Sequence, residues 1–384
     1  MKTSNRVFAS MIATLLITTP IYSFANMDEV EAVAAESSAP LSQFTPRPTK
    51  ATRIDYEPWD FILSETVLFM GPSTRTRASK QGSQTGTRLQ RIEDSPYRME
   101  GNKVLYPMMN DLVQEDMAAY AEELVALGNK LDIPALPRNE QLAYWLNLHN
   151  ALIITTIQSN YPGPSRRPHL IKPIKGSDAK LHDAKLIKID GLDLSLRDIR
   201  ERIVYPNWDN PDIAFGFHHG HLGGPSIMNI AYTGENLRSL LRDNATEYAN
   251  SLRGYHSGRL APFFYEIAPW YFPDFKKDLT TYLKRRMRSE VFSEFEQTGI
   301  RSKNSPEYVV ADISSGYGLD QGIGKFYGNP ISLGSSANLG PAIEAFLVER
   351  ELKAQKLLKT DWFKRGTVTI EDIETDDGIP DEIE

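Results

Sequence analysis

Cysteine is absent from the 384 residues of this chain. A chain without cysteine has no disulfide framework, no thiolate nucleophile and no cysteine-ligated zinc site. Its length, with 41% hydrophobic residues, lets it bury a core without cross-links. We therefore expect a fold that is held by packing, and any chemistry must be independent of a thiol.

Long hydrophobic runs are missing after the first 25 residues. Those residues combine Lys2 and Arg6 with a mainly apolar run and end on the small-x-small sequence Ser23-Phe24-Ala25, the layout of a secretory signal peptide. Pro20 interrupts the run, and its uninterrupted part is short for a membrane anchor. We expect cleavage after Ala25, a periplasmic or secreted location, and no membrane span in the mature chain.

An excess of basic charge is also lacking. The formal net charge is −7, and it becomes −9 once the signal peptide with its two basic residues is removed. Residues 371–384 hold eight acidic residues and no basic one, which leaves the body near −1. A nearly neutral body argues against nucleic acid as a general partner. We expect an unknown small-molecule or protein ligand instead.

The acidic tail, residues 361–384, contains a partial calcium-loop pattern, because Gly378 stands six positions before Glu384. The same alignment places Ile373 at the first ligand position and Thr375 at the third, where a calcium loop carries Asp or Asn. Two ligand positions are therefore wrong. We therefore interpret the segment as a solvated tail. Upstream, residues 73–103 hold seven Lys or Arg against three acids. This stretch predicts a long solvated loop or a basic arm that folds over a site and contacts an anion.

Periodicity predicts a mainly helical chain with a small antiparallel sheet, the α+β class. The order is a disordered leader at 26–52 and one domain at 53–360, with its core at 110–285 and the basic loop at 71–104. Helices are predicted at 55–70, 111–131, 138–163, 233–254, from about Asp274, and at 342–359. A hairpin is predicted at 186–194 with Asp190-Gly191 as its turn. Residues 212–217, DIAFGF, read as a short strand.

The helix at 138–163 is apolar nearly all round, which predicts a buried helix with Asn139 as a plausible N-cap. Glu140, Asn147 and Asn150 form one polar stripe on it. Buried polar groups cost free energy unless they find partners. The stripe is therefore either a structural clamp or the floor of a site.

The stretch AFGFHHGHLGGPSIMN places His218, His219 and His221 close together. On an extended strand, His219 and His221 would face one side and His218 the other. The pair could bind zinc or copper if His149 or Glu140 supplied a third ligand, act as a general base, or close a turn. The N–H groups around Gly223 and Gly224 could hold an anion. Ser226 lacks a nucleophile elbow, which disfavours a serine hydrolase.

NEQLAYWLNLHNALIITTI resembles a conserved block of the domain of unknown function 547 family (DUF547), Asn-Glu-x-x-x-Phe/Tyr-Trp-x-Asn-x-Tyr-Asn-Ala. NPDIAFGFHHGHLGGPSI and WYFPDF resemble its second and third blocks, and MGPSTRTRASKQGSQTGTR and YRMEGNKVLY resemble an upstream extension of one branch. The resemblance covers roughly residues 55–285. The family has no settled activity, so the resemblance implies fold and boundaries more than chemistry.

The chain departs from that family at three positions. Many members carry a block that resembles Phe-Ala-Leu-x-Cys-Gly-x-x-x-Cys-Pro-Pro, whose cysteines fall on His219 and Gly224 here. The common tyrosine of the first block falls on His149. A branch without cysteine cannot act as a cysteine peptidase or a thiol transferase.

We predict a ligand-binding cleft between the helix at 139–158 and the loop at 218–226. The alternative is a thiol-independent hydrolase or transferase with histidine as general base. We predict no cofactor and assign no metal site. The candidate catalytic residues are His219 and His221, and the candidate ligand-binding residues are Glu140, Asn147, His149, Asn150, Gly223, Gly224 and Ser226.

Overall fold

The computed structural model of the chain describes residues 39–78, 95–160, 173–305, 307–313 and 341–359. The expected signal peptide, the acidic tail and the centre of the basic stretch lie outside the described residues. The described residues from Pro40 onward belong to one structural unit. No helix within these ranges has the length and apolar character that a bilayer crossing requires.

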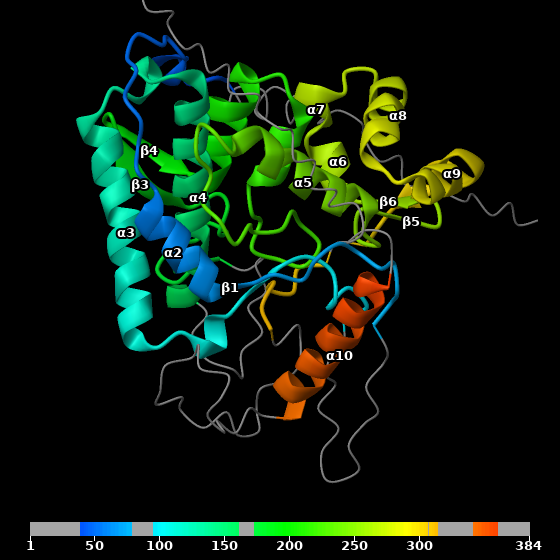
Figure 1. The fold of residues 1–384 in the computed structure, drawn as a ribbon. Helices are drawn as coiled ribbons and strands as arrows, with labels where there is room; N and C mark the ends of the chain where they lie inside the picture. Colours follow the sequence, from blue (N-terminus) through cyan, green and yellow to red (C-terminus); the bar gives the residue numbers. More distant parts are fainter. Residues whose placement is uncertain (1–38, 79–94, 161–172, 306, 314–340, 360–384) are drawn as a thin grey trace, which may run out of the picture. The chain divides into compact units, whose positions relative to one another are not determined.

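Helices make up most of the described fold (Figure 1). The α-helices are α2 (Glu57–Thr66), α3 (Asp111–Lys130), α4 (Arg138–Asn160), α5 (Leu237–Asn250), α6 (Pro262–Glu266), α7 (Ala268–Tyr271), α8 (Phe275–Arg286), α9 (Ser289–Thr298) and α10 (Pro341–Leu358). The short 3-10 turns are η1 (Ser42–Phe44), η2 (Tyr106–Met108), η3 (Ile133–Ala135), η5 (Tyr205–Asn207) and η6 (Pro211–Gly216), and η4 (Asp198–Val204) is a π-type turn.

The strands are short and form three separate sheets. They are β1 (Val67–Leu68), β2 (Lys103–Val104), β3 (Lys185–Ile189), β4 (Leu192–Ser195), β5 (Tyr255–His256), β6 (Arg259–Leu260) and β7 (Ser302–Lys303). β1 pairs with β2, β3 with β4, and β5, β6 and β7 form a third sheet in that order. The mainly helical α+β prediction is confirmed, although β6 and β7 run parallel and the strands do not join into one sheet.

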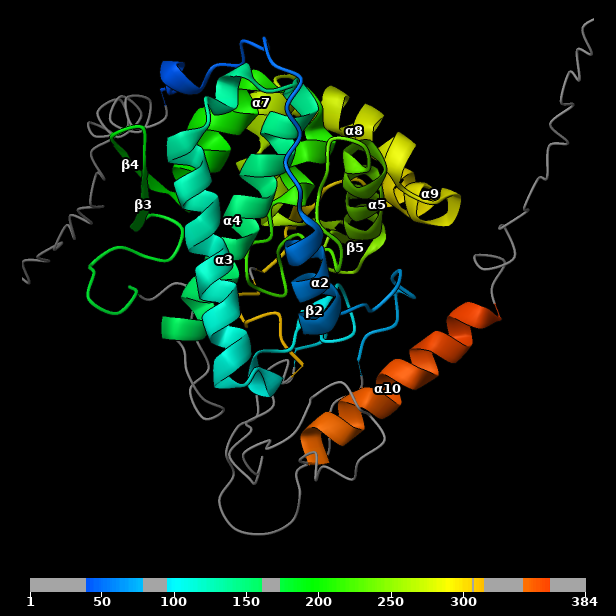
Figure 2. The same ribbon diagram turned by 60° about the vertical axis from the view of Figure 1, so that its left-hand side comes forward.

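The helices α3 and α4 lie side by side in the core (Figures 1 and 2). α3 begins where the side chain of Asn110 accepts a hydrogen bond from the backbone N–H of Val113. α4 is buried along nearly its whole length, as its apolar sequence predicts. Its first residue is Arg138, so Asn139 does not cap it; the Asn139 amide donates to the carbonyl of Gly234 at 3.2 Å.

The predicted hairpin is confirmed as β3 and β4, and β3 packs against α3. Asp190 and Gly191 form its turn with φ angles of 48° and 77°. Positive φ at both central residues is the requirement of a type I′ turn, and Asp-Gly satisfies it at low cost. Local sequence alone therefore specifies this element.

The strand predicted at 212–217 is wrong, because Pro211–Gly216 forms the 3-10 turn η6. Asn210 caps the turn, since its side chain accepts from the N–H of Asp212. Ile213 and Phe215 are both buried, so no exposed face distinguishes strand from helix in this short apolar run. Strand alternation therefore cannot be used to place His218 on the side opposite to His219 and His221.

The disordered leader predicted at 26–52 is not disordered over its described part. The N–H of Leu41 donates to the carbonyl of Arg202 at 2.9 Å, and the N–H of Arg47 donates to Pro134 at 2.8 Å. The ring of Phe44 packs edge-on against Trp145 of α4, with ring centroids 5.2 Å apart. A single aromatic residue in a polar stretch thus anchors the segment to the core.

The described ends of the basic stretch, residues 73–78 and 95–103, include side chains that are buried rather than solvated. We call residues 95–104 the arm. Arg98 forms an ion pair with Glu349 of α10, and the ammonium of Lys353 donates to the carbonyl of Met99 at 2.8 Å. Burial lowers the pKa of Lys103 well below its usual range. The solvated-loop interpretation is therefore wrong for the arm, which packs against the fold.

Candidate functional site

Asn150 of α4 holds the histidine loop, residues 216–226, in place. Its side-chain N–H donates to the carbonyl of Gly216 at 3.0 Å, and its Oδ1 accepts from the N–H of His218 at 2.9 Å. Both partners are backbone groups of the loop. Since the amide is buried, these bonds satisfy polar groups that would otherwise cost free energy.

The other two residues of the polar stripe have similar backbone partners. Asn147 donates to the carbonyl of Tyr232 at 2.7 Å and accepts from its N–H at 3.0 Å. The carboxylate of Glu140 accepts from the N–H of Ile54 at 3.4 Å and lies against Gly234. The hydrogen bonds therefore favour a structural clamp over the floor of a site.

A buried arginine sits behind the histidine loop. Nη1 of Arg200, in η4, donates to Nε2 of His149 at 2.9 Å and to Nδ1 of His182 at 3.1 Å. Because guanidinium only donates, both ring nitrogens must be acceptors. The other ring nitrogens then carry the protons and donate, to Oδ1 of Asn150 and to the carbonyl of His219, each at 3.3 Å. Arg200 thus sets two tautomers and positions the His219 backbone.

Both of these histidines are neutral near pH 7. Burial lowers the pKa of His149 and of His182 well below the usual range, and the Arg200 charge lowers both further. Protonation would also remove the lone pair that accepts from Arg200. His149, which was a candidate metal ligand and ligand-binding residue, therefore supports the loop from beneath.

Ser226 and Nδ1 of His218 also find partners within the fold, whereas Nε2 of His218 is buried without one among the described residues. Nδ1 of His218 donates to the carbonyl of Pro225 at 3.0 Å, and burial lowers the pKa of this ring to about 4. The hydroxyl of Ser226 accepts from Nη2 of Arg253 at 2.9 Å and from the N–H of Asn102 at 3.2 Å. These contacts give Ser226 a role in holding the loop.

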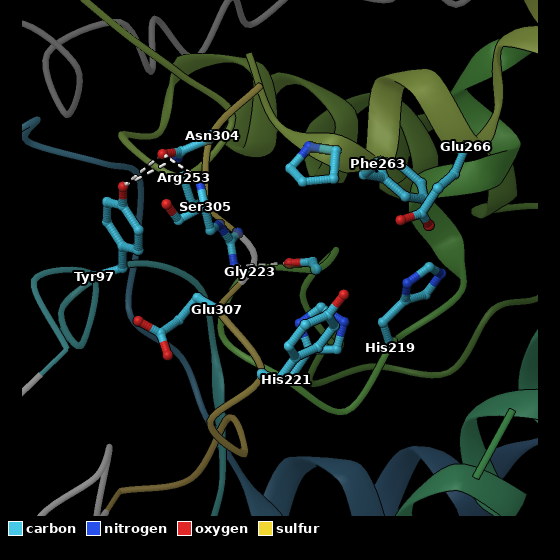
Figure 3. Close-up of a pocket in the computed structure, with 13 residues that line it drawn as sticks. Tyr97, His219, His221, Gly223, Arg253, Phe263, Glu266, Asn304, Ser305 and Glu307 are labelled. Atoms are coloured by element: carbon cyan, nitrogen blue, oxygen red, sulfur yellow. Dashed lines mark hydrogen bonds between the residues drawn. The ribbon is translucent and has the colours of Figure 1, made fainter. Parts of the chain in front are cut away.

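A pocket lies on the side of the loop where His219 and His221 are found (Figure 3). Its cavity volume is about 30 Å³, and the atom-free space reaches about 420 Å³ only when the part open to solvent is included. The histidine pocket is lined by Tyr97, His219, His221, Gly223, Gly224, Arg253, Pro262, Phe263, Glu266, Asn304, Ser305, Glu307 and Tyr308.

Of the residues predicted from the sequence, the pocket is lined by His219, His221 and the glycine pair Gly223 and Gly224. Glu140, Asn147, His149, Asn150 and Ser226 are not part of its wall. The cleft that we predicted between α4 and the loop is therefore not this pocket. Its walls come from the loop, the arm, Arg253, α6 and residues 304, 305, 307 and 308.

The glycine pair allows two close approaches. A Cβ atom on Gly224 would lie 2.7 Å from Cβ of His219, and one on Gly223 would lie 3.0 Å from the carbonyl oxygen of Glu307. The N–H of Gly223 donates to that same carbonyl, and the N–H of Gly224 donates to the carbonyl of His221. These N–H groups are therefore occupied and do not form the anion site that the glycines suggested.

The two pocket histidines each keep a ring nitrogen that no group among the described residues hydrogen-bonds: Nε2 of His219 and Nδ1 of His221. The His219 ring is 6% exposed and packs edge-on against Phe263, with centroids 5.2 Å apart. Burial lowers the pKa of His219 well below its usual range, and the Arg200 charge lowers it further. Burial likewise lowers the pKa of His221 to about 3.

Arg253 forms one wall of the pocket but is bound within the fold. Nη1 donates to the carbonyl of Gly224 at 3.1 Å, and Nη2 forms an ion pair with Glu247. Nε donates to Ser251 at 3.3 Å. The guanidinium thus ties the histidine loop to the end of α5.

Glu266, the last residue of α6, extends into the pocket near the ring of His219 (Figure 3). The Glu307 carboxylate accepts from the hydroxyl of Ser95 at 3.1 Å and points away from the hollow in the same view. Desolvation raises the pKa of Glu266, and Arg200 opposes the rise. Tyr308 packs against His221, with ring centroids 5.3 Å apart.

Sequence reasoning missed the pocket residues that follow the histidine loop in the chain. Arg253, Phe263, Glu266 and Tyr308 belong to no motif and are separated by long intervals. Glu266 alone left a trace, as a single acid within the aromatic run FFYEIAPWYF. In the parts of the chain that are described, three or more His, Cys, Asp or Glu side chains nowhere converge in a way that could hold a metal ion.

These features define an α+β protein with a pocket of neutral histidines on a loop that α4 and Arg200 hold in place. The family model of a protein of unknown function, DUF547, matches residues 133–249. The match confirms the resemblance seen in the sequence, so the chain carries a DUF547 region in a cysteine-free form. No curated protein and no solved structure matches the chain at a significant level.

Proposed function

We propose that this is an exported binding protein whose histidine pocket takes a small polar ligand. One observation carries the proposal: Nε2 of His219 and Nδ1 of His221 are buried in the wall of one pocket without a hydrogen-bond partner among the described residues. Buried polar atoms in native proteins usually find partners. Other buried side-chain atoms of the described residues, such as Nε2 of His218, also lack one, but these two belong to residues that line the pocket. A ligand with polar groups would supply partners for them.

The electrostatics of the pocket favour binding over proton transfer. A general base works best when its pKa lies near the operating pH. Burial lowers the pKa of His221 to about 3 and lowers that of His219 strongly, so both rings are weak bases in this pocket. Neutral imidazoles can still donate and accept hydrogen bonds.

The signal-peptide layout of residues 1–25 supports export. An exported protein with a small pocket and no thiol would meet small ligands in the periplasm or outside the cell. The pocket walls come partly from the arm and from residues after 249, outside the DUF547 match. We infer that those segments determine which ligand is taken.

The test is a thermal-shift screen of the purified mature protein with small polar compounds of several classes, followed by titration calorimetry of each hit. His221→Phe keeps the ring contact with Tyr308 and removes both nitrogens, so it should abolish the response to hits. His256→Phe, on β5 and outside the pocket, is the matched control and should respond like wild type. An empty screen, or hits that survive His221→Phe, would contradict the proposal.

A further inference from the structure

The guanidinium and the glycine N–H groups in the wall of the histidine pocket already donate within the fold. The guanidinium of Arg253 directs its N–H groups to Ser226, Glu247, Ser251 and backbone carbonyls. The backbone N–H groups of the glycine pair also donate within the fold. An anionic ligand would therefore find no free charged donor in the described part of this wall.

The carboxylate of Glu266 is the strongest acceptor that the pocket presents. Within the described ranges it takes part in no hydrogen bond or ion pair, and it extends toward the hollow (Figure 3). Glu266 is exposed at the edge of the pocket, so water solvates its carboxylate, although the surrounding protein still desolvates it in part and raises its pKa. A cation beside it would reduce the cost of that partial desolvation.

The remaining charges of the wall do not offset Glu266. The guanidinium of Arg253 is already paired with Glu247, and the carboxylate of Glu307 points away from the hollow (Figure 3). Arg200 adds positive charge behind His219, and its Nη1 donates to His149 and His182 rather than into the hollow.

The shape and chemistry of the other side chains also fit an ammonium group. His219 lines the pocket, is 6% exposed as a residue, and its Nε2 is buried without a partner among the described residues. A neutral imidazole nitrogen can accept an N–H bond. Phe263 and Tyr308 line the same hollow, and aromatic faces attract cations.

We propose that the ligand of the histidine pocket carries a primary amine, whose ammonium group binds the Glu266 carboxylate between Phe263 and Tyr308. The assignment rests on the proposed binding function and adds the chemical class of the ligand. Glu266 is the residue that selects for positive charge, and His219 accepts a hydrogen bond from the bound group.

Three probes of one shape separate charge from size: benzylamine, benzyl alcohol and benzoate. Each is titrated into the mature protein at pH 7 and low salt, by calorimetry and by NMR of the histidine ring nitrogens. Benzylamine should bind and shift the His219 and His221 resonances. We expect benzoate to bind about tenfold more weakly or worse, because Glu266 repels it.

The variant Glu266→Gln keeps the side-chain size and removes the charge. This variant should bind benzylamine about tenfold more weakly than wild type does, and its affinities for the three probes should differ less. Glu296→Gln removes one charge from an exposed position on α9 and should leave binding unchanged. The melting temperature of each unliganded variant shows whether it folds.

Two failures are distinguishable. If benzoate or benzyl alcohol binds as tightly as benzylamine, or if Glu266→Gln binds benzylamine like wild type, the amine assignment is wrong and the proposed function stands. The amine assignment is also wrong, and the proposed function still stands, if benzylamine does not bind but a compound of another chemical class in the wider screen does. If the whole screen is empty, both the assignment and the proposed function are wrong.

Discussion

Nη1 of Arg200 lies 2.9 Å from Nε2 of His149, which joins a buried cation to a neutral imidazole. The same guanidinium nitrogen bonds His182, whose other ring nitrogen donates to the carbonyl of His219. A chain of hydrogen bonds therefore runs from η4 to the backbone of the pocket. Because guanidinium keeps its proton at every accessible pH, it holds each ring in one tautomer.

Arg200→Met should raise the pKa of both His149 and His182, because the Arg200 charge is the second cause, after burial, of their lowered values. Titration followed by NMR of the ring nitrogens measures this directly. Arg238→Met, at an exposed position of α5, is the control and should leave both values unchanged. Values that stay the same in Arg200→Met would show that the guanidinium does not act on these rings.

Asn147→Ala should lower the free energy of unfolding by about 1 to 3 kcal/mol, because it leaves the buried N–H and carbonyl of Tyr232 without partners. Urea denaturation of both proteins checks this. Gln297→Ala removes an exposed amide of α9 and should change stability by less than about 0.5 kcal/mol. An unchanged midpoint for Asn147→Ala would contradict the clamp.

Stability should fall as the pH falls below about 6.5, the ordinary histidine value expected in the unfolded chain. In the folded chain, burial lowers the pKa of His218 to about 4 and that of His221 to about 3. Between the folded pKa values and about 6.5, the unfolded chain therefore binds more protons than the folded chain. The stability that the neutral histidines contribute is fully present above about pH 6.5 and is lost as the pH falls toward 4.

Urea midpoints at pH 7, 6 and 5 measure that slope. Each such histidine contributes about 1.4 kcal/mol per pH unit within its window. His218→Asn should reduce the slope by about one proton, since asparagine can still donate to Pro225 without titrating. A variant slope equal to that of wild type would mean that His218 is not the group that titrates.

The mature protein should begin at Asn26 and appear in a periplasmic or culture extract, because Ser23-Phe24-Ala25 has the small-x-small form of a cleavage site. N-terminal sequencing of the chain from its natural host, or from a bacterial expression host, checks this. Replacement of Ala25 by a bulky residue should leave the precursor uncleaved. A protein that retains Met1 in the cytoplasm would rule out export.

Sequence patterns predicted the elements whose structure depends on near neighbours. The turn at Asp190-Gly191 follows from two residues that tolerate positive φ, and the burial of α4 follows from its apolar circumference. The histidine cluster also drew attention to the loop that carries the pocket. The polar stripe on α4 was recognised, while its role stayed open until its partners were known.

The strand predicted for DIAFGF was wrong because its packing is decided by distant groups. Asp212 is held by Arg286 and Tyr282 of α8, and Asn244 of α5 donates to the carbonyl of Phe215 at 2.6 Å. A short apolar run that is buried on all sides has no period from which to choose strand or helix.

By itself, the sequence determined the helical class, the absence of thiol chemistry, the central buried helix and the loop where His219 and His221 meet. These are properties of composition and of short-range pattern. Only the tertiary structure decided which side of that loop is hollow and which charges face the hollow. Glu266 joins His219 from 47 positions away, and such a meeting depends on how α6 packs, because long-range contacts arise from the whole core rather than from local preference.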